Sequence, residues 1–478
     1  MNIFREQAYI DGQWLGADSG AQMDVNDPAT GAIIGTVPKM GAGETARAIS
    51  AAQAAMPAWA AKTAKERATV LRRFFDLMMT HQEALATLLT REQGKSLTEA
   101  RGEIAYAAGF MEWFAEEGKR VYGDVIPSHA ADKRIIVLKQ PVGVVAAITP
   151  WNFPSAMITR KLAPALAAGC AVVLKPASET PFSALALAVL AEEAGLPAGL
   201  FNVVTGKAGD IGTELTRNPA VRKLSFTGST EIGRMLLEQC APTVKKTSME
   251  LGGNAPFIVF EDADLDAAVE GALVSKFRNS GQTCVCTNRF YVQSAVHDRF
   301  VSKLADAVAR MKVGNGLDAE TQQGPLINMK AVDKIEEHIA DAVAKGAAVA
   351  TGGHRHALGH SFFEPTVLSG VTQAMTVAHE ETFGPLAAII RFETEAEVIA
   401  LANDTEFGLA AYFYARDLGR VWRVAEALES GIVGVNTGLI STEIAPFGGV
   451  KQSGTGREGS KYGIDDYLEV KYVCMGIG

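Results

Sequence analysis

The chain has 478 residues, of which 48% are hydrophobic and 21% charged, a composition typical of a globular protein with several large cores. Its net charge of −9 comes with no concentrated basic block, which argues against a nucleic-acid partner, and no apolar run reaches the roughly 18 residues of a membrane span. The five cysteines are too few and scattered for a disulfide framework, and residues 1–14 resemble neither a secretory signal nor a transit peptide. We therefore expect a cytoplasmic protein of about three domains, at roughly 150 residues each.

The predicted elements begin with helices. Alanine-rich amphipathic patterns predict helices over 46–56, 66–80 and 96–117, with Pro57 ending the first. From about residue 133, short apolar strands alternate with helices. The strands are expected at 135–138, 142–148, 171–174, 201–204 and 223–226, and the helices at 161–168, 182–194 and 231–240. This alternation is typical of a doubly wound parallel sheet.

A second block of the same kind starts near residue 251. Strands are expected at 257–260 and 290–292, and helices at 265–277 and 297–311. The predicted fold class is therefore α/β, with two doubly wound domains. The strand-like stretches 121–138 and 467–473 lie outside both patterns, and we expect them to pair as an appended sheet or to reach a neighbouring subunit.

A possible nucleophile is Cys284, in the stretch Ser280-Gly281-Gln282-Thr283-Cys284-Val285-Cys286. Small polar residues and glycine around it predict an exposed turn, whose amides can lower the thiol pKa and stabilise an oxyanion. A structural cysteine is the alternative. Half of a metal pair is less favoured, because Cys-x-Cys lacks a second pair at ligand spacing. The cluster of His354, His356 and His360 is interpreted as a solvated loop, so no metal is expected.

Two more polar residues follow apolar strands. Glu250 ends a predicted strand before Gly252 and Gly253, where a carboxylate can act as a general base. Asn152 follows the strand at 142–148, and its amide can donate to an oxyanion. An exposed strand-end glutamate and an asparagine in a proline-flanked turn are the alternatives.

Phosphate-binding signals lie between these residues. Thr227-Gly228-Ser229-Thr230 joins a strand to a helix, an arrangement that presents free amides and a positive helix end to a phosphate. Lys175 follows a buried strand and can hold a ribose or a phosphate, with a surface lysine as the alternative. The glycine cluster at 206–212 is interpreted as an ordinary loop.

Taken in order, these fragments form a series of motifs along nearly the whole chain: Pro150-Trp151-Asn152-Phe153-Pro154, Lys175-Pro176-Ala177, Phe226-Thr227-Gly228-Ser229, Glu250-Leu251-Gly252-Gly253, Gly281-Gln282-Thr283-Cys284, Glu381-Thr382-Phe383-Gly384-Pro385 and Pro446-Phe447-Gly448-Gly449. The series resembles the aldehyde dehydrogenases. That resemblance implies that Cys284 attacks an aldehyde, that Asn152 and the Cys284 amide hold the oxyanion, and that Glu250 activates water against the thioester. Hydride would pass to a nicotinamide dinucleotide, held by Trp151, Lys175, Ser178, Gly228, Ser229, Leu251, Glu381 and Phe383.

The same resemblance divides the chain. Residues 1–117 and 139–250 would form the cofactor-binding domain and 251–443 the catalytic domain. Residues 118–138 and 460–478 would supply oligomerisation strands of a homodimer or homotetramer.

The stretches around Arg160, Arg278 and residues 451–463 are similar to succinate-semialdehyde dehydrogenases, in which Arg160, Arg278 and Ser441 would grip a distal carboxylate. A bidentate arginine suits a carboxylate, although either arginine can instead belong to a structural ion pair. The implied substrate is a short ω-oxo acid, first succinate semialdehyde and next glutarate semialdehyde, with a broader aldehyde range as the alternative. Ser178, three positions after Lys175, admits a 2′-phosphate, so NADP is the expected cofactor with NAD tolerated, although Glu179 can oppose a phosphate.

Cys286 is either a reversible disulfide partner of Cys284 or a packed side chain. Three other classes are considered: a non-catalytic binding protein on the same fold, a CoA-acylating relative, and a cysteine hydrolase without redox chemistry. The presence of Cys284, Glu250 and Asn152 together disfavours the first, Glu250 the second, and the phosphate-binding elements the third.

Overall fold

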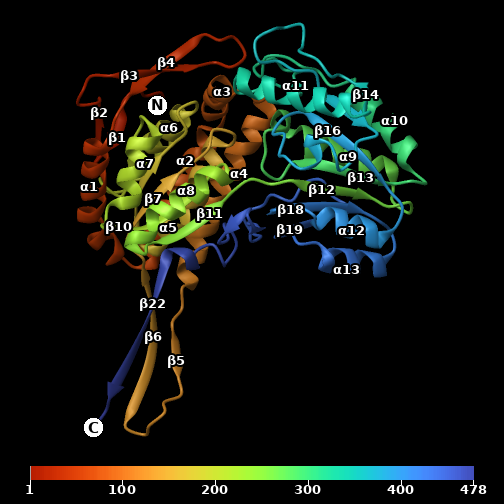
Figure 1. Cartoon of the computed structure of the whole chain (residues 1–478). Coiled ribbons are helices and arrows are strands. Elements are labelled where there is room, and N and C mark those ends of the chain that lie inside the picture. Colours follow the sequence, from red (N-terminus) through yellow and green to blue (C-terminus); the bar gives the residue numbers. More distant parts are fainter. Residues whose placement is uncertain (1) are drawn as a thin grey trace.

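A computed structural model describes residues 2–478, which form two lobes and a projecting arm (Figure 1). Each lobe is built around one large sheet covered by helices, and the arm carries a third, small sheet. The expectation of two doubly wound α/β domains with an appended β element is thereby confirmed.

The first lobe contains an eight-stranded sheet of order β2-β1-β9-β8-β7-β10-β11-β21. Its parallel centre consists of β9 (Phe201–Val203), β8 (Ala171–Lys175), β7 (Val144–Ile148), β10 (Val221–Thr227) and β11 (Lys246–Glu250). Antiparallel strands extend the edges: β1 (Ala8–Ile10), β2 (Gln13–Leu15) and β21 (Gly454–Thr455). The chain order reverses at β7, because β8 and β9 continue on one side and β10 and β11 on the other. Ligands of doubly wound sheets bind beside such a reversal, at the carboxyl ends of the strands.

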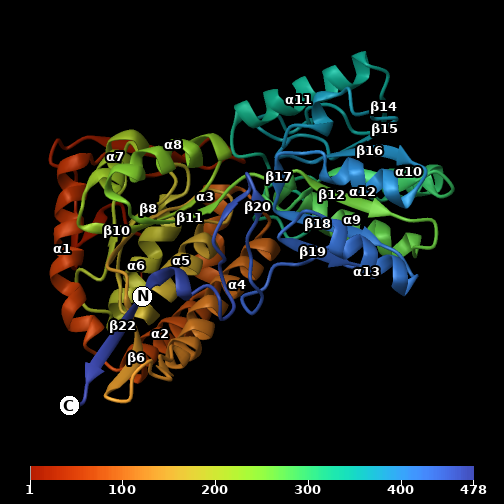
Figure 2. The same cartoon turned by 60° about the horizontal axis from the view of Figure 1, so that its bottom comes forward.

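Helices cover both faces of this sheet (Figure 2). α7 (Ala208–Arg217) and α8 (Thr230–Cys240) lie on one face, with α1 (Ala42–Ala60) packed against α7. α5 (Pro154–Ala168) and α6 (Pro181–Glu193) lie on the other, under α2 (Ala64–Thr80), α3 (Gln82–Gln93) and α4 (Leu97–Glu117). Every residue of α5 is buried because the sheet contacts one side and α2 and α4 the other.

The second lobe contains a seven-stranded sheet of order β14-β15-β16-β13-β12-β18-β19. Its strands are β12 (Ala255–Val259), β13 (Thr287–Gln293), β14 (Ala348–Thr351), β15 (Thr366–Ser369), β16 (Leu386–Phe392), β18 (Ala410–Tyr414) and β19 (Ile432–Val435), of which β14 alone among these is antiparallel to its neighbour. α9 (Leu265–Phe277) and α10 (His297–Val308) form a core on one face. α11 (Met329–Ala344), α12 (Glu395–Asn403) and α13 (Leu418–Ala427) form a second core on the other.

The arm is an antiparallel sheet of order β22-β6-β5, and the C-terminus lies on it (Figure 1). β22 (Leu468–Gly476) pairs with β6 (Lys133–Pro141) along its whole length, and β5 (Asp124–Ile126) covers the other edge of β6. The two stretches outside the α/β patterns therefore do pair as an appended sheet. Two small ribbons complete the fold: β3 (Gln22–Asn26) with β4 (Ile33–Pro38), and β17 (Phe407–Gly408) with β20 (Val450–Lys451).

Some expected boundaries are wrong. Pro57 lies inside α1 rather than at its end. Its carbonyl still accepts the Ala61 amide, so the helix loses only the one hydrogen bond that a proline, without an N–H, cannot donate. The glycine cluster at 206–212 is not a loop throughout, since α7 begins at Ala208. Helix α3 lies within residues 43–120, which the sequence predicts to be mostly helical, although no separate helix was assigned to it. Within residues 2–478, no helix combines the length and apolarity needed to cross a membrane.

Candidate active site

A cavity of about 270 Å³ opens between the lobes. The carboxyl edge of the first sheet supplies residues that follow β7, β10 and β11, and the second lobe supplies residues that precede β13 and β16. Most residues expected at the site line this one cavity: Trp151, Asn152, Arg160, Gly228, Ser229, Leu251, Arg278, Cys284, Glu381, Phe383 and Ser441. Lys175, Ser178, Glu250 and Cys286 do not line it.

Cys284 follows a tight turn between α9 and β13. Asn279 and Ser280 adopt left-handed backbone angles, and at Gly281 a Cβ atom would lie 2.2 Å from the Gly384 carbonyl oxygen. The expected lowering of the thiol pKa is wrong. Burial raises the pKa of Cys284 to about 12, Glu381 adds to the rise, and Arg160 opposes it. The resting thiol is therefore protonated and needs a base to become a nucleophile.

Asn152 is buried at the carboxyl end of β7, opposite the loop that carries Cys284. Its Nδ2 donates to the Gln282 carbonyl at 2.9 Å, and its Oδ1 accepts the Phe153 amide at 3.1 Å. A carboxamide has two N–H donors, so one remains for a ligand in the cavity. The Cys284 backbone amide makes no hydrogen bond with residues 2–478.

Glu250 is the last residue of β11 and is 3% exposed, behind the cavity wall rather than on it. Neither carboxylate oxygen has a hydrogen-bond partner among the described residues. Burial raises the pKa of Glu250 well above its usual range, and the neighbouring Glu458 adds to the rise. The charge of Glu250 also contributes to the raised pKa of Cys284, so the two groups interact.

Arg160 and Lys161, on α5, both pair with Glu458. Arg160 Nε lies 2.8 Å from Glu458 Oε2, and Lys161 Nζ donates to Glu458 Oε1 at 2.6 Å. Burial alone would raise the pKa of Glu458, but Lys161 and then Arg160 outweigh it and the pKa is lowered. The alternative reading of Arg160, a structural ion pair, is thus observed, although its Nη2 has no partner among the described residues.

Arg278 has a different setting. No carboxylate of residues 2–478 lies within ion-pair distance of its guanidinium, which sits 5.2 Å from the centroid of the Phe153 ring. The Tyr106 hydroxyl, on α4, is buried beside the cavity and has no partner in the described chain. The charges of Arg160 and Arg278 oppose the rise in the Tyr106 pKa that burial causes, so this hydroxyl lies near both arginines. Together with Ser441, these groups can receive an anion.

The opposite part of the cavity has the features of a dinucleotide site. Glu381 accepts the Gly253 amide at 3.1 Å, and burial raises its pKa to about 7. Phe383, at φ 56°, meets the Trp151 ring edge to face at 5.6 Å. Ser229 caps α8, so the helix N-terminus opens at the cavity. The Gly228 amide already donates to the Glu250 carbonyl, so it is not free for a phosphate. Gly228 can still contribute by letting a ligand approach the backbone closely.

Lys175 is the last residue of β8 and is 5% exposed. Burial lowers its pKa, and the charge of Glu179 partly offsets this fall. Ser178 is half-buried and Glu179 exposed. In the part of the chain described, the Lys175 ammonium has no carboxylate within ion-pair distance. It can therefore bind a ribose or a phosphate.

Cys286 packs behind the cavity wall. Its Sγ donates to the Lys276 carbonyl at 3.5 Å, and burial raises its pKa. Both Cys284 and Cys286 are free thiols. Within residues 2–478, no group of three or more histidine, cysteine or acidic side chains is arranged to bind a metal ion.

Sequence reasoning missed Tyr106, Glu458, Thr227 and Thr283. The hydroxyls of Thr227 and Thr283 are buried without partners, and both residues line the cavity. Each threonine lies within a motif that the sequence did single out, so its position was a signal, but no role was assigned to its hydroxyl. Tyr106 gave no such signal, because it lies mid-helix far from every motif.

The chain matches the protein-family model "Aldehyde dehydrogenase family" over residues 14–473. The chain belongs to the aldehyde dehydrogenase family. It is 70% identical to the glutarate-semialdehyde dehydrogenase of Pseudomonas aeruginosa strain PAO1 over 474 residues, which cover 99% of this chain and 98% of that protein. It is 69% identical to the NADP(+) succinate-semialdehyde dehydrogenase of Escherichia coli strain K12 over 476 residues, covering 100% and 99%.

The crystal structure of succinate-semialdehyde dehydrogenase from Burkholderia pseudomallei superposes with a TM-score of 0.99, at 68% identity and with 99% and 98% of the two chains covered. The resemblance inferred from the ordered motifs is therefore confirmed, and every motif except Lys175-Pro176-Ala177 contributes a residue to the cavity lining.

Proposed function

We propose that this aldehyde dehydrogenase oxidises a short ω-oxo carboxylic acid, first succinate semialdehyde and next glutarate semialdehyde, to the dicarboxylate. The observation that carries the proposal is Arg278, a cation without a protein carboxylate in the described chain that lines the same cavity as Cys284. An arginine left unpaired in a mostly apolar cavity favours an anionic ligand. The relatives named for the two semialdehydes stand at 70% and 69% identity, so identity does not choose between chain lengths.

The chemistry follows from the side chains. Glu250, whose raised pKa makes it a stronger base than an ordinary carboxylate, takes the proton of Cys284 as Sγ adds to the aldehyde carbon. The free N–H of Asn152 and the Cys284 amide stabilise the resulting oxyanion. A bound nicotinamide dinucleotide supplies the acceptor for the hydride that leaves the thiohemiacetal carbon.

Loss of that hydride leaves a thioester on Cys284. Glu250 first releases the proton of the thiol to solvent. Water then attacks the acyl carbon while Glu250 takes a proton from it, and the C–S bond breaks to release the acid and a thiolate, which regains its proton from Glu250. The two electrons leave as the hydride, so no second oxidant is needed.

For the cofactor, we propose NADP with NAD tolerated. Ser178 offers a hydroxyl where an acid would repel a 2′-phosphate, and Lys175 offers a cation. Glu179 is exposed, which limits its opposition. Comparing kcat/KM for the two cofactors tests this, and Ser178→Glu should move the preference towards NAD. Equal preference in wild type and variant would refute the role of Ser178.

A substrate panel tests the whole assignment. Reduced-cofactor absorbance would be followed with ω-oxo acids and uncharged aldehydes, with each cofactor, and with and without CoA. Dependence on CoA would indicate an acylating relative, and no turnover of any aldehyde a binding protein. Substantial turnover by Cys284→Ala would refute the mechanism.

Cys286 lies two residues from the nucleophile, and we propose that peroxide oxidises the two thiols to a disulfide, with two protons and two electrons passing to the peroxide. Inactivation should be reversed by a dithiol reductant. Reversible inactivation that persists in Cys286→Ser would exclude the pairing.

We also propose a cytoplasmic homodimer or homotetramer assembled through the arm. Apolar side chains are exposed on its strands, including Val125, Val470 and Tyr472, and an open strand edge with apolar residues is a pairing surface. Sedimentation of wild type and Val470→Glu tests the assembly.

A further inference from the structure

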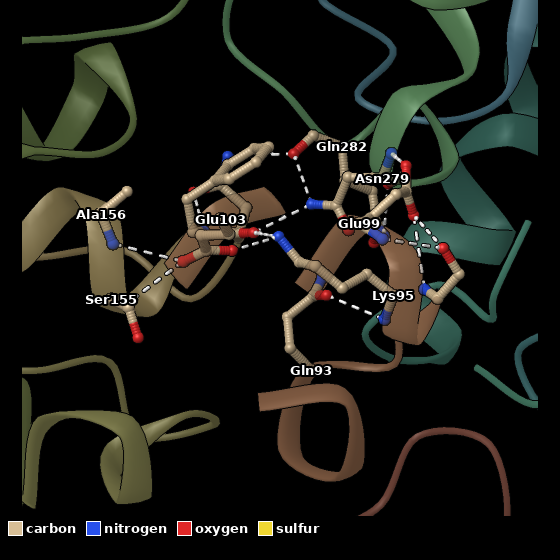
Figure 3. A network of polar contacts seen from close by, with 11 residues as sticks. Gln93, Lys95, Glu99, Glu103, Ser155, Ala156, Asn279 and Gln282 are labelled. Atoms are coloured by element: carbon tan, nitrogen blue, oxygen red, sulfur yellow. Dashed lines mark hydrogen bonds and ion pairs between the residues drawn. The ribbon is translucent and has the colours of Figure 1, made fainter. Parts of the chain in front are cut away.

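A buried ion pair lies directly behind the Asn152 backbone. Lys95 and Glu103 both have fully buried side chains, and Lys95 Nζ lies 2.5 Å from Glu103 Oε2. The same Nζ donates to the Asn152 carbonyl at 2.8 Å and lies 3.7 Å from the centroid of the Phe153 ring. Figure 3 shows the Lys95 ammonium reaching Glu103 in the middle of a polar network.

The main chain around Lys95 is fixed from both sides. Lys95 follows Gly94, the left-handed cap of α3, and precedes Ser96, whose side chain caps α4. The Lys95 amide also donates to Gln93 Oε1 at 3.0 Å. The backbone of Lys95 is therefore fixed, which limits the positions that its ammonium group can take.

Glu103 connects the ammonium to the helix that follows Asn152. Its Oε1 accepts the amides of Ser155 at 2.9 Å and Ala156 at 3.3 Å, at the first turn of α5 (Figure 3). A carboxylate is favourable at a helix N-terminus, where backbone amides lack partners. The pair therefore fixes the short segment between β7 and α5 at two points.

The second lobe holds the same carbonyl from its other side. Asn279 Nδ2 donates to the Asn152 carbonyl at 2.9 Å, and the Asn152 side chain donates to the Gln282 carbonyl at 2.9 Å. Asn279 is tied in turn to α4, because its amide donates to Glu99 Oε1 at 2.7 Å (Figure 3). The loop that carries Cys284 and the segment that carries Asn152 thus share one network.

We propose that the Lys95–Glu103 ion pair is a positioning element for the oxidation step: it fixes the Asn152 peptide so that the free side-chain N–H faces the aldehyde oxygen, which becomes the oxyanion when Cys284 attacks the neighbouring carbon. This inference rests on the oxyanion role proposed for Asn152. Lys95 touches neither substrate nor thiol and acts through Asn152 alone.

A double-mutant cycle separates this role from general stability. Lys95→Met and Asn152→Ala would be made singly and together, and kcat measured at saturating aldehyde and cofactor. Removing one oxyanion donor lowers kcat by roughly 100- to 1,000-fold, and we expect Lys95→Met to lose part of that, roughly tenfold or more. In the Asn152→Ala background, whose backbone carbonyl is intact, Lys95→Met should cost nothing further. An undiminished loss in that background, or a wild-type kcat for Asn152→Ala, would overturn the proposal.

A second readout concerns the thiol. Alkylation of Cys284 by iodoacetamide is a displacement that forms no oxyanion, so its rate should be the same in Lys95→Met and wild type. A parallel fall in alkylation and kcat would show that the pair supports the whole cysteine loop instead. Aldehyde oxidation by wild type and its loss in Cys284→Ala report on the proposed function, independently of the cycle.

Glu92 offers a matched control. It is buried like Glu103 and accepts the amides of Phe182 and Ser183, both at 2.8 Å, at the start of α6, but it has no contact with Asn152. Glu92→Gln should leave kcat near wild type, and an equal loss would argue for a merely structural effect. If Lys95→Met does not fold, as judged by circular dichroism and thermal unfolding, Glu103→Gln takes its place in the cycle, with the same expected and contrary outcomes.

Discussion

Arginine 278 and arginine 160 line one cavity, yet replacing each by methionine should have different consequences. Arg278 has no carboxylate partner in the described chain, whereas Arg160 lies 2.8 Å from Glu458. Arg278→Met therefore removes a binding group and leaves no buried charge behind. A hydrogen bond to a charged group contributes about 1.5–3 kcal/mol, so kcat/KM for succinate semialdehyde should fall roughly ten- to hundredfold. Butanal, of the same length without the carboxylate, should be oxidised as by wild type.

Arg160→Met should instead lower kcat for both aldehydes. The Arg160 charge opposes the raised pKa values of both Glu250 and Cys284, so its loss leaves the base and the thiol more strongly protonated. Glu458 would keep only Lys161 as a partner.

Steady-state rates of both variants with both aldehydes would be measured from cofactor reduction. An unchanged KM for succinate semialdehyde in Arg278→Met, or an equal loss with butanal, would refute the carboxylate role. Circular dichroism of each variant excludes misfolding as the cause.

Further predictions concern the Tyr106 hydroxyl, the role of Glu250 and the titration of two buried groups. Tyr106→Phe removes a buried hydroxyl without a partner in the described chain, so KM for ω-oxo acids should rise severalfold with butanal unaffected, and equal effects on both would contradict its role. Glu250→Gln should give one burst of reduced cofactor followed by accumulation of an acyl-enzyme detectable by mass spectrometry, whereas continued turnover would remove Glu250 as the base. Because the pKa of Cys284 is about 12, its alkylation in the cofactor-free enzyme should still accelerate between pH 8 and 10, and a plateau there would show a lower pKa. Burial raises the pKa of Glu92 from 4.5 to about 8. The contribution of Glu92 to the free energy of unfolding is therefore fully present below pH 4.5 and is lost as the pH rises through 8. Urea unfolding should show that the free energy of unfolding of Glu92→Gln increases relative to that of wild type across this range.

The local sequence patterns predicted the elements well where one period dominated. The strand at 171–174 is an apolar run with a β-branched pair, and α9 has the predicted ends because Asp264 caps its start. Pro57 and the glycine cluster at 206–212 were misread because tertiary packing tolerates one lost amide and glycines within a helix.

The site was predictable in a different way. Its motifs can be read from the sequence, but the charge state of each group depends on which distant side chains approach it. Cys284 has a turn-like sequence and yet a raised pKa, because the turn is covered by the opposite lobe. The pairing of Arg160 with Glu458 joins residues 298 positions apart, and Lys95 reaches Asn152 across 57 positions, separations at which no periodicity applies.

The buried glutamates around the cavity show why one of them can act as the base. Glu103 is held by Lys95 and two amides, and Glu458 is paired with Lys161 and Arg160. Glu250 has neither cation nor amide bonded to its carboxylate in the described chain, and its pKa rises while that of Glu458 falls. Neighbouring carboxyls whose environments separate their pKa values are a mark of divided acid–base roles. Among Glu103, Glu250 and Glu458, the carboxylate of Glu250 is thus the one without a bonded cation in the described chain, which supports the role of base proposed for it.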